Sequence, residues 1–179
     1  TPNVDGRTLD NVIDFFTYVA VPALMVYWFN MTPVPNLFFA PQTWSLVSAA
    51  TIMAVSCYTF ANTGMKSDDY YFVGFPALWN VVVLYFFILD TGWVGNLATV
   101  AVLSVLTFIP IKFVHPLRVT DWREITIPLT VLWAALSLSL IFAAKDRSDW
   151  GTVEQVQLWV WVAASVYFAS ISLWRTFFK

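Results

Sequence analysis

The chain contains six apolar stretches of about 20 residues, and almost all of its charged side chains lie between them. A helix needs roughly that length of apolar sequence to cross the hydrocarbon core of a bilayer. The runs are continuous and do not alternate with polar residues, so they predict helices and not barrel strands. We therefore expect an all-α fold, a polytopic membrane helical bundle in which residues 1–179 form a single membrane domain. Its six transmembrane helices would cover residues 10–29, 43–62, 71–89, 94–111, 125–144 and 155–174.

The composition excludes other classes of protein. Hydrophobic residues make up 59% and charged residues 11% of the chain, whereas a soluble domain carries about 25% charged residues. Disordered chains have low hydrophobicity and high net charge, which is the opposite pattern. Nine Lys and Arg residues against eleven Asp and Glu residues give a net charge of -2. We therefore expect no nucleic-acid partner, because such proteins carry a basic surface.

The basic residues predict the orientation of the helices, because cytoplasmic loops are enriched in Lys and Arg. With the amino terminus inside, seven basic residues fall on the cytoplasmic side and two on the outer side. The inner set is Arg7, Lys66, Lys112, Arg118, Arg123, Arg175 and Lys179, and the outer set is Lys145 and Arg147. Both termini are therefore predicted to be cytoplasmic.

The first apolar stretch contains two acidic residues, Asp10 and Asp14. Ionisable residues within a membrane span are costly and usually face a partner or a cavity. Gly6, Asp10 and Asp14 are spaced four apart, so they lie on one helical face, which Tyr18 continues. Two ionised carboxylates one turn apart repel unless a cation lies between them, and such oxygen ligands suit Mg²⁺ or Mn²⁺. Gly6 would leave room for a phosphate or a nucleotide.

A structural role explains the same residues in another way. Asp10 could cap the amino terminus of a helix, and Asp5 or Asp14 could complement the positive end of the helix dipole. The spacing alone leaves the metal site and the helix cap open.

The segment from Gly6 to Asp14 resembles the second half of the CDP-alcohol phosphotransferase signature, G-x-x-x-D-x-x-x-D. Residues 4–15, 72–80 and 112–118 resemble one branch of that family, the bacterial phosphatidylcholine synthases. The first half of the signature, D-x-x-D-G-x-x-A-R, is absent from these 179 residues. The chain therefore resembles the carboxy-terminal part of such an enzyme, with about two upstream helices missing, and we expect the fragment by itself to be inactive.

The resemblance implies transfer of a phosphatidyl group from CDP-diacylglycerol to choline, with release of CMP. Asp10 and Asp14 would match metal ligands for Mn²⁺ or Mg²⁺, Asp14 would also be the catalytic base, and Gly6 would lie beside the CDP moiety. It further implies a bacterial inner-membrane enzyme with its active site on the cytoplasmic side. Membrane lipid is an expected partner, and a homodimer is a candidate assembly.

Two further groups of residues could contact substrate. Aromatic faces attract quaternary ammonium ions such as choline, which makes Tyr18 the first candidate and Tyr70, Tyr71 and Trp79 weaker ones. Lys112, His115 and Arg118, at the predicted cytoplasmic end of the fourth span, could hold a lipid phosphate. Positive-inside anchoring explains these basic residues equally simply.

Three rival interpretations remain. The chain could be a phosphatidylserine synthase or another CDP-alcohol phosphotransferase with a different acceptor, because the signature is shared. It could be a six-helix cation or proton-coupled transporter, although the other five spans contain no acid below their ends. A purely structural membrane subunit would leave the acidic face unexplained.

Overall fold

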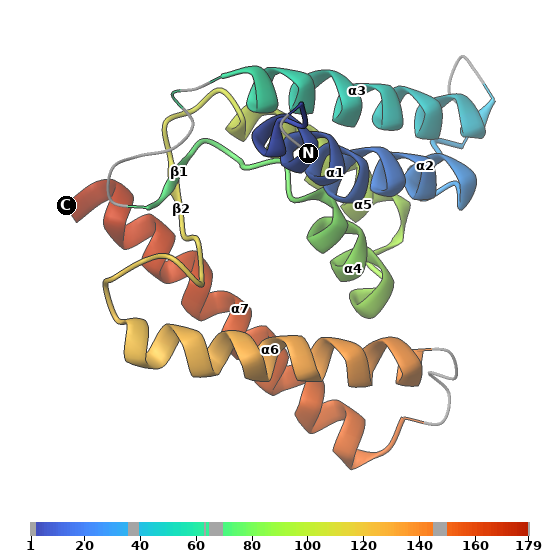
Figure 1. Ribbon diagram of the computed structural model, residues 1–179. Coiled ribbons are helices and arrows are strands. Elements are labelled where there is room, and N and C mark those ends of the chain that lie inside the picture. The colour runs from blue at the N-terminus through green and yellow to red at the C-terminus, as the bar shows by residue number, and fades with distance from the viewer. Residues whose placement is uncertain (1–2, 36–39, 63, 65–69, 145–149, 179) are drawn as a thin grey trace. The chain divides into compact units, whose positions relative to one another are not determined.

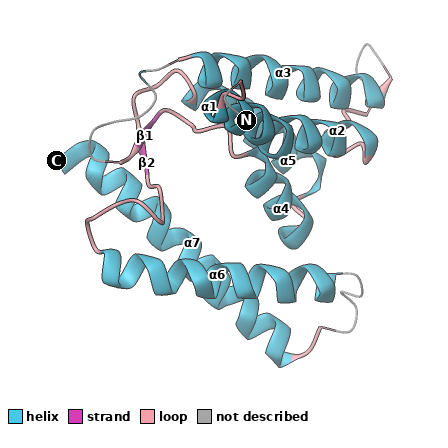
Figure 2. Cartoon of the chain, viewed as in Figure 1, coloured by secondary structure: helices cyan, strands magenta, loops and turns pink. Residues whose placement is uncertain are grey.

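The computed structural model describes residues 3–35, 40–62, 64, 70–144 and 150–178, and most of this backbone is helical (Figures 1 and 2). Four basic residues used to predict the orientation, Lys66, Lys145, Arg147 and Lys179, lie outside the described residues. The helices are α1 (Gly6–Phe15), the π-helical turn η1 (Phe16–Ala20), α2 (Val21–Trp28), α3 (Pro41–Ala61), α4 (Trp79–Leu89), α5 (Gly92–Leu106), α6 (Arg123–Ala143) and α7 (Thr152–Phe178). The strands are β1 (Phe72–Val73) and β2 (Lys112–Phe113).

The helices confirm the all-α membrane class. In the described part of the chain, four helices are long and apolar enough to cross a bilayer: Gly6–Trp28, Pro41–Ala61, Arg123–Ala143 and Thr152–Phe178. The first of these combines α1, η1 and α2. Helices α4 and α5 are apolar but contain only 11 and 15 residues. At 1.5 Å per residue they extend about 16 and 22 Å, less than the hydrocarbon thickness of about 30 Å.

The predicted bounds of the third and fourth spans were wrong at one end each. Residues 71–78 are not helical, because α4 begins at Trp79, and α5 ends at Leu106 and not at Ile111. Gly74 and Ala77 have positive φ angles of 83° and 56°, which no α-helix accommodates. The apolar segment before α4 and the segment that follows α5 instead form a short antiparallel ribbon. In this ribbon, Phe72 of β1 lies opposite Phe113 of β2.

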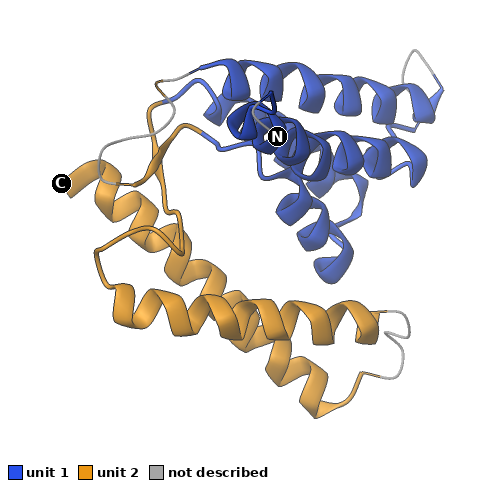
Figure 3. Cartoon of the chain, in the orientation of Figure 1, with its two compact units in different colours: residues 1–63, 75–109 blue, residues 64–74, 110–179 orange. Residues whose placement is uncertain are grey.

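The chain forms two compact units (Figure 3). Unit 1 comprises Thr1–Thr63 and Phe75–Ile109, and unit 2 comprises Gly64–Gly74 and Pro110–Lys179. Asp10, Asp14 and Tyr18 therefore belong to unit 1, whereas Lys112 and Arg118 belong to unit 2.

Unit 1 is built around α2, which packs against α3 and α4. Val19, Ala23 and Val26 follow a helical spacing and are almost completely buried. At the loop after α2, Thr32 is fully buried and donates a hydrogen bond of 2.9 Å to Ser48 of α3. The carbonyl of Met31 accepts a bond of 2.8 Å from Asn96 of α5. These polar contacts satisfy the loop's buried groups and fix one end of the unit.

Unit 2 consists of the β1–β2 ribbon and the pair α6 and α7. Ser137 and Ser165 accept hydrogen bonds from the indole nitrogens of Trp161 and Trp133, at 2.8 and 3.2 Å. The two indole rings stack with centroids 6.0 Å apart. The ribbon is joined to α7 because the Lys112 amide donates to Thr176 at 2.8 Å and the Val114 amide to Ser172 at 3.0 Å.

Candidate active site

Helix α1 begins at Gly6 because Asp5 caps it. One oxygen of the Asp5 carboxylate accepts the Arg7 amide at 3.1 Å, and the other accepts the Thr8 hydroxyl at 2.6 Å. Hydrogen bonds from Thr8 and Arg7 favour the charged carboxylate and therefore lower the pKa of Asp5. The alternative that Asp10 caps this helix is thus wrong, since Asp10 lies one turn inside it.

The two acidic residues of the first span lie on a regular α-helix. Gly6, Asp10 and Asp14 are all within α1, so their four-residue spacing places them on one side of the helix. Asp10 is exposed, Asp14 is half-buried, and α1 has no buried residue. A Cβ atom added at Gly6 would meet no atom within 4 Å. The face is therefore accessible to a ligand, and the space beside Gly6 is open.

Tyr18 extends this face, as its spacing predicted. It is half-buried and lies in η1, immediately after α1. Its phenol lies close enough to the carboxylates of Asp14 and Asp10 for their charges to act on it. The three side chains therefore form one electrostatic group, which we call the acidic face.

The donor set of the acidic face suits a divalent cation but does not complete a site. Two carboxylates one turn apart repel each other, and a cation between them relieves that repulsion. Carboxylate oxygens are preferred by Mg²⁺ and Mn²⁺. Among the described residues, no group of three or more His, Cys, Asp or Glu side chains is placed to hold a metal ion. Asp10 and Asp14 can therefore supply part of a ligand shell, and other oxygen donors would have to supply the remainder.

Lys112 and Arg118 occupy unit 2, outside any helix. Lys112 is in β2, and the exposed Arg118 donates its amide to the His115 carbonyl at 3.0 Å in the turn that follows. The expectation that they lie at a helix end was wrong because α5 ends before them. His115 follows β2, and its ring stacks on Phe72 with centroids 5.4 Å apart.

Tyr71 is the centre of a cationic cluster in unit 2. The Lys112 ammonium lies 6.0 Å and the Arg175 guanidinium 5.5 Å from the centroid of its ring. Arg175 also pairs with Asp121 at 3.4 Å. Tyr71 is only 2% exposed and already contacts two cations. Sequence reasoning missed Arg175 and Asp121, because no local pattern links residues so far apart in the chain.

The remaining aromatic candidates differ in their surroundings. Trp79 is fully buried, and its ring packs edge-on against Phe75 with centroids 5.0 Å apart. Tyr70 is exposed. Trp79 therefore serves packing within unit 1, and of the aromatic candidates only Tyr18 adjoins the acidic residues among the described contacts.

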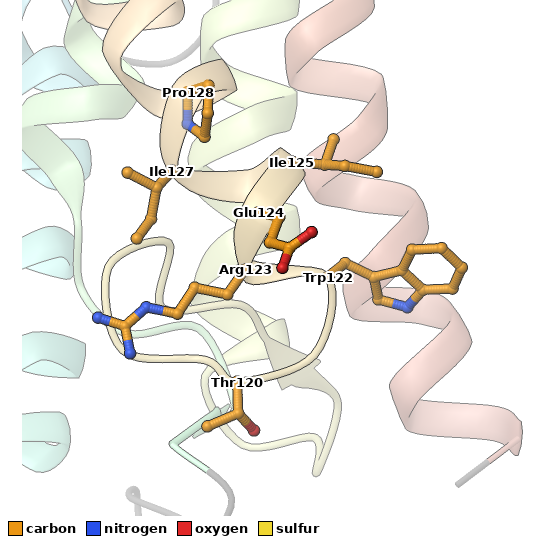
Figure 4. Close-up of a pocket in the computed structure, with 7 residues that line it drawn as sticks. All are labelled: Thr120, Trp122, Arg123, Glu124, Ile125, Ile127 and Pro128. Atoms are coloured by element: carbon orange, nitrogen blue, oxygen red, sulfur yellow. The ribbon is translucent and has the colours of Figure 1, made fainter.

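An open hollow of about 950 Å³ lies at the start of α6. Figure 4 shows the residues that line it: Thr120, Trp122, Arg123, Glu124, Ile125, Ile127 and Pro128. Its charged residues are one adjacent pair of opposite sign, and none of the candidate site residues lines it. Trp122 has a φ angle of 56°. Its side chain is 58% exposed, as expected for an aromatic ring at a membrane interface. The hollow lacks the paired carboxylates on which the predicted chemistry depends.

The apolar helices and the charged face at the start of the first span define an integral membrane protein. The chain is 43% identical over 176 residues to the phosphatidylcholine synthase of Pseudomonas aeruginosa, which covers 98% of the chain and 68% of that protein. It is 39% identical over 152 residues to the phosphatidylcholine synthase of Rhizobium johnstonii, which covers 85% of the chain and 60% of that protein. The chain belongs to the phosphatidylcholine synthase family, which confirms the resemblance seen in the sequence.

A more distant relative shows the same coverage. The phosphatidylcholine synthase of Borreliella burgdorferi is 32% identical over 172 residues, which covers 96% of the chain and 67% of that protein. The chain thus spans roughly two thirds of the length of these relatives. No family profile matches the chain, and no solved structure is significantly similar to it.

Proposed function

We propose that the protein transfers the phosphatidyl group of CDP-diacylglycerol to choline, giving phosphatidylcholine and CMP. The acidic face carries this proposal, because it supplies carboxylates for a cation, open space at Gly6 for the diphosphate, and an aromatic ring at Tyr18. The relatives named phosphatidylcholine synthase support choline as the acceptor.

The proposed reaction joins the choline oxygen to the phosphorus that bears diacylglycerol. The bond from that phosphorus to the oxygen of CMP breaks, and CMP leaves with the bond's electron pair. The choline hydroxyl loses its proton to the carboxylate of Asp14, which acts as general base. Asp14 suits this role because it is half-buried and close to Tyr18 but still accessible.

Asp10 and Asp14 would hold Mg²⁺ or Mn²⁺ together with further oxygen donors, because the described residues contain no group of three or more His, Cys, Asp or Glu placed for a metal ion. Such a cation, when bound, neutralises charge on the diphosphate and on the departing CMP. Gly6 allows the diphosphate to approach the helix backbone, since its side of α1 is open. The ring of Tyr18 attracts the quaternary ammonium of choline.

We also place Lys112 and Arg118 in the proposal, as cations for the phosphate of a lipid. The distribution of basic residues supports a cytoplasmic acidic face with both termini of the chain on the same side. Reaction of a thiol at Thr8→Cys, in a Cys57→Ser background, with a membrane-impermeant reagent in intact cells and in inverted vesicles tests this orientation. Labelling only in inverted vesicles is expected, and labelling in intact cells would contradict it.

The function is tested by CMP release from CDP-diacylglycerol in the presence of Mn²⁺. The assay compares the 179-residue chain with a fusion that places the amino-terminal segment of the Pseudomonas aeruginosa relative before it. We expect choline-dependent release from the fusion and none from the chain alone. Activity in the chain alone would contradict the predicted need for upstream carboxylates.

The acidic face does not itself distinguish choline from other alcohols, so serine and ethanolamine are assayed in parallel. Release that depends on serine and ignores choline would replace the choline assignment with a serine one. Release with no acceptor preference at all would overturn the role of Tyr18.

A further inference from the structure

The helix that carries the acidic face changes its hydrogen-bonding register directly after Asp14. Helix α1 ends at Phe15, the turn η1 is π-helical, and α2 begins at Val21. The amide of Val21 donates to the carbonyl of Phe16, five residues before it and not four. A π-turn therefore acts as one extra residue in the helix, and one residue corresponds to a rotation of about 100°.

Pro22 gives a physical reason for this π-turn. It lies at the start of α2 and is fully buried within one continuous helix. Proline has no amide hydrogen, and its ring collides with the carbonyl four residues before it, here that of Tyr18. Widening the helix at Phe16–Ala20 relieves that collision. The Thr17 hydroxyl donates to the carbonyls of Ile13 at 2.9 Å and Asp14 at 3.4 Å, which supports the altered turn.

The two sides of the turn are held with different strength. Within the turn Val19, and after it Ala23 and Val26, are at most 3% exposed and pack within unit 1. Before it, α1 has no buried residue. If the π-turn reverted to a regular α-helix, the buried side would keep its place and α1 would rotate. Asp10 and Asp14 would then turn by about 100° relative to α2 and α3.

We propose that Pro22 is a positioning residue: by maintaining the π-turn at Phe16–Ala20, it sets the rotation of Asp10, Asp14 and Tyr18 about the helix axis. The effect of Pro22 on catalysis rests on the proposed function, whereas its effect on the rotation of α1 does not. A structural readout and a catalytic readout therefore test the inference separately.

The structural readout is a thiol cross-link between α1 and α3. The rings of Phe15 and Phe60 lie 5.5 Å apart by their centroids and make an edge-on contact within unit 1. Cysteines replace both residues in a Cys57→Ser background, because Cys57 is exposed on α3. A short bifunctional thiol reagent, applied in membranes, is expected to link the pair. Adding Pro22→Ala should abolish the link, because α1 rotates away from α3.

The matched control is Pro41→Ala. Pro41 also lies in the first turn of a helix in unit 1, but no residues of that helix precede it. Its replacement removes no interior clash, so the cross-link is expected to persist. A link that persists in Pro22→Ala would overturn the proposal, as would a link lost equally in both variants.

The decisive variant combines Pro22→Ala with deletion of Phe16. This deletion removes the extra residue of the π-turn, so a regular α-helix regains the original alignment of its two sides. Phe16 is 61% exposed, so its loss removes no buried packing. Asp14 and Tyr18 become three residues apart, which still places them on one face. The cross-link is expected to return, and its failure to return would contradict the register explanation.

The catalytic readout is kcat/KM for choline in the active fusion. We expect a fall of about tenfold or more in Pro22→Ala, since small misplacement of catalytic groups has such effects. Recovery is expected in the double variant, and Pro41→Ala should match the wild type. If the wild type shows no choline-dependent release, the proposed function fails, while the cross-links still decide the role of Pro22. Restored cross-linking without restored kcat/KM would overturn the catalytic part of the inference.

Discussion

The indole nitrogen of Trp79 donates a hydrogen bond of 2.9 Å to the hydroxyl of Ser56, and both side chains are fully buried. This bond joins the first residue of α4 to α3. Helix α4 has only 11 residues, so it depends on such contacts more than a long span does. The Trp79 bond therefore holds α4 against α3 in unit 1, which also carries the acidic face.

Removing this bond should destabilise the protein. Ser56→Ala leaves the buried indole N–H of Trp79 without its acceptor, which costs about 1–2 kcal/mol of the free energy of unfolding. Ser170→Ala is the matched control, because Ser170 is exposed and, among the described residues, donates to the carbonyl of Val166 in its own helix. Denaturant titration in detergent measures both variants. Equal stability of the two would show that the Trp79–Ser56 bond contributes little.

The pKa of Asp5 should depend on the hydroxyl of Thr8. Thr8→Val removes the strongest contact that lowers this pKa, so the value should rise towards that of an ordinary aspartate. Thr8→Ser keeps a hydroxyl and should keep the low pKa. Carboxyl-carbon NMR during a pH titration measures all three proteins. A pKa that is the same in Thr8→Val and the wild type would contradict the capping geometry.

The same pKa predicts how the start of α1 responds to acid. A lowered pKa in the folded state stabilises α1 at pH values above the unfolded-state pKa of Asp5. This contribution is lost as the pH falls through the folded-state pKa, because the protonated cap no longer binds the amides as strongly. The protection factors of the Arg7 and Thr8 amides, which correct for the intrinsic pH dependence of exchange, should fall in that acidic range. Protection factors that stay constant across it would mean that Asp5 does not stabilise the first turn.

Tyr18 should affect the KM for choline more than kcat. Tyr18→Leu removes the aromatic face, and a cation–π contact of about 0.5–2 kcal/mol corresponds to a rise of about 2- to 30-fold in KM. Tyr18→Phe keeps the ring and should retain most of the affinity. A KM that is unchanged in Tyr18→Leu would remove Tyr18 from the choline site.

The sequence predicted the long helices well because run length and lack of charge are strong signals for membrane spans. It failed at residues 71–78, since an apolar segment near a membrane can also form a ribbon or a buried loop. Gly74 and Pro76 were the local sequence signals that these residues are not helical.

The acidic face was predictable because its residues share one helix and a fixed spacing. Its rotation was not predictable from spacing, because the π-turn breaks the period between Phe16 and Ala20. Pro22 within the first apolar run was the available signal. The pairing of Arg175 with Asp121 depends on tertiary packing, so no local pattern could reveal it.

The role proposed for the Asp14 carboxylate in transfer to choline is tested by CMP release from Asp14→Asn in the active fusion. This substitution keeps the shape of the side chain but removes its ability to accept a proton, so kcat should fall by about 100-fold or more. Asp5→Asn is the control, because asparagine also caps helices and Asp5 lies outside the acidic face. We expect near-normal release from Asp5→Asn and almost none from Asp14→Asn. Choline-dependent release by Asp14→Asn at the wild-type rate would contradict the proposed role.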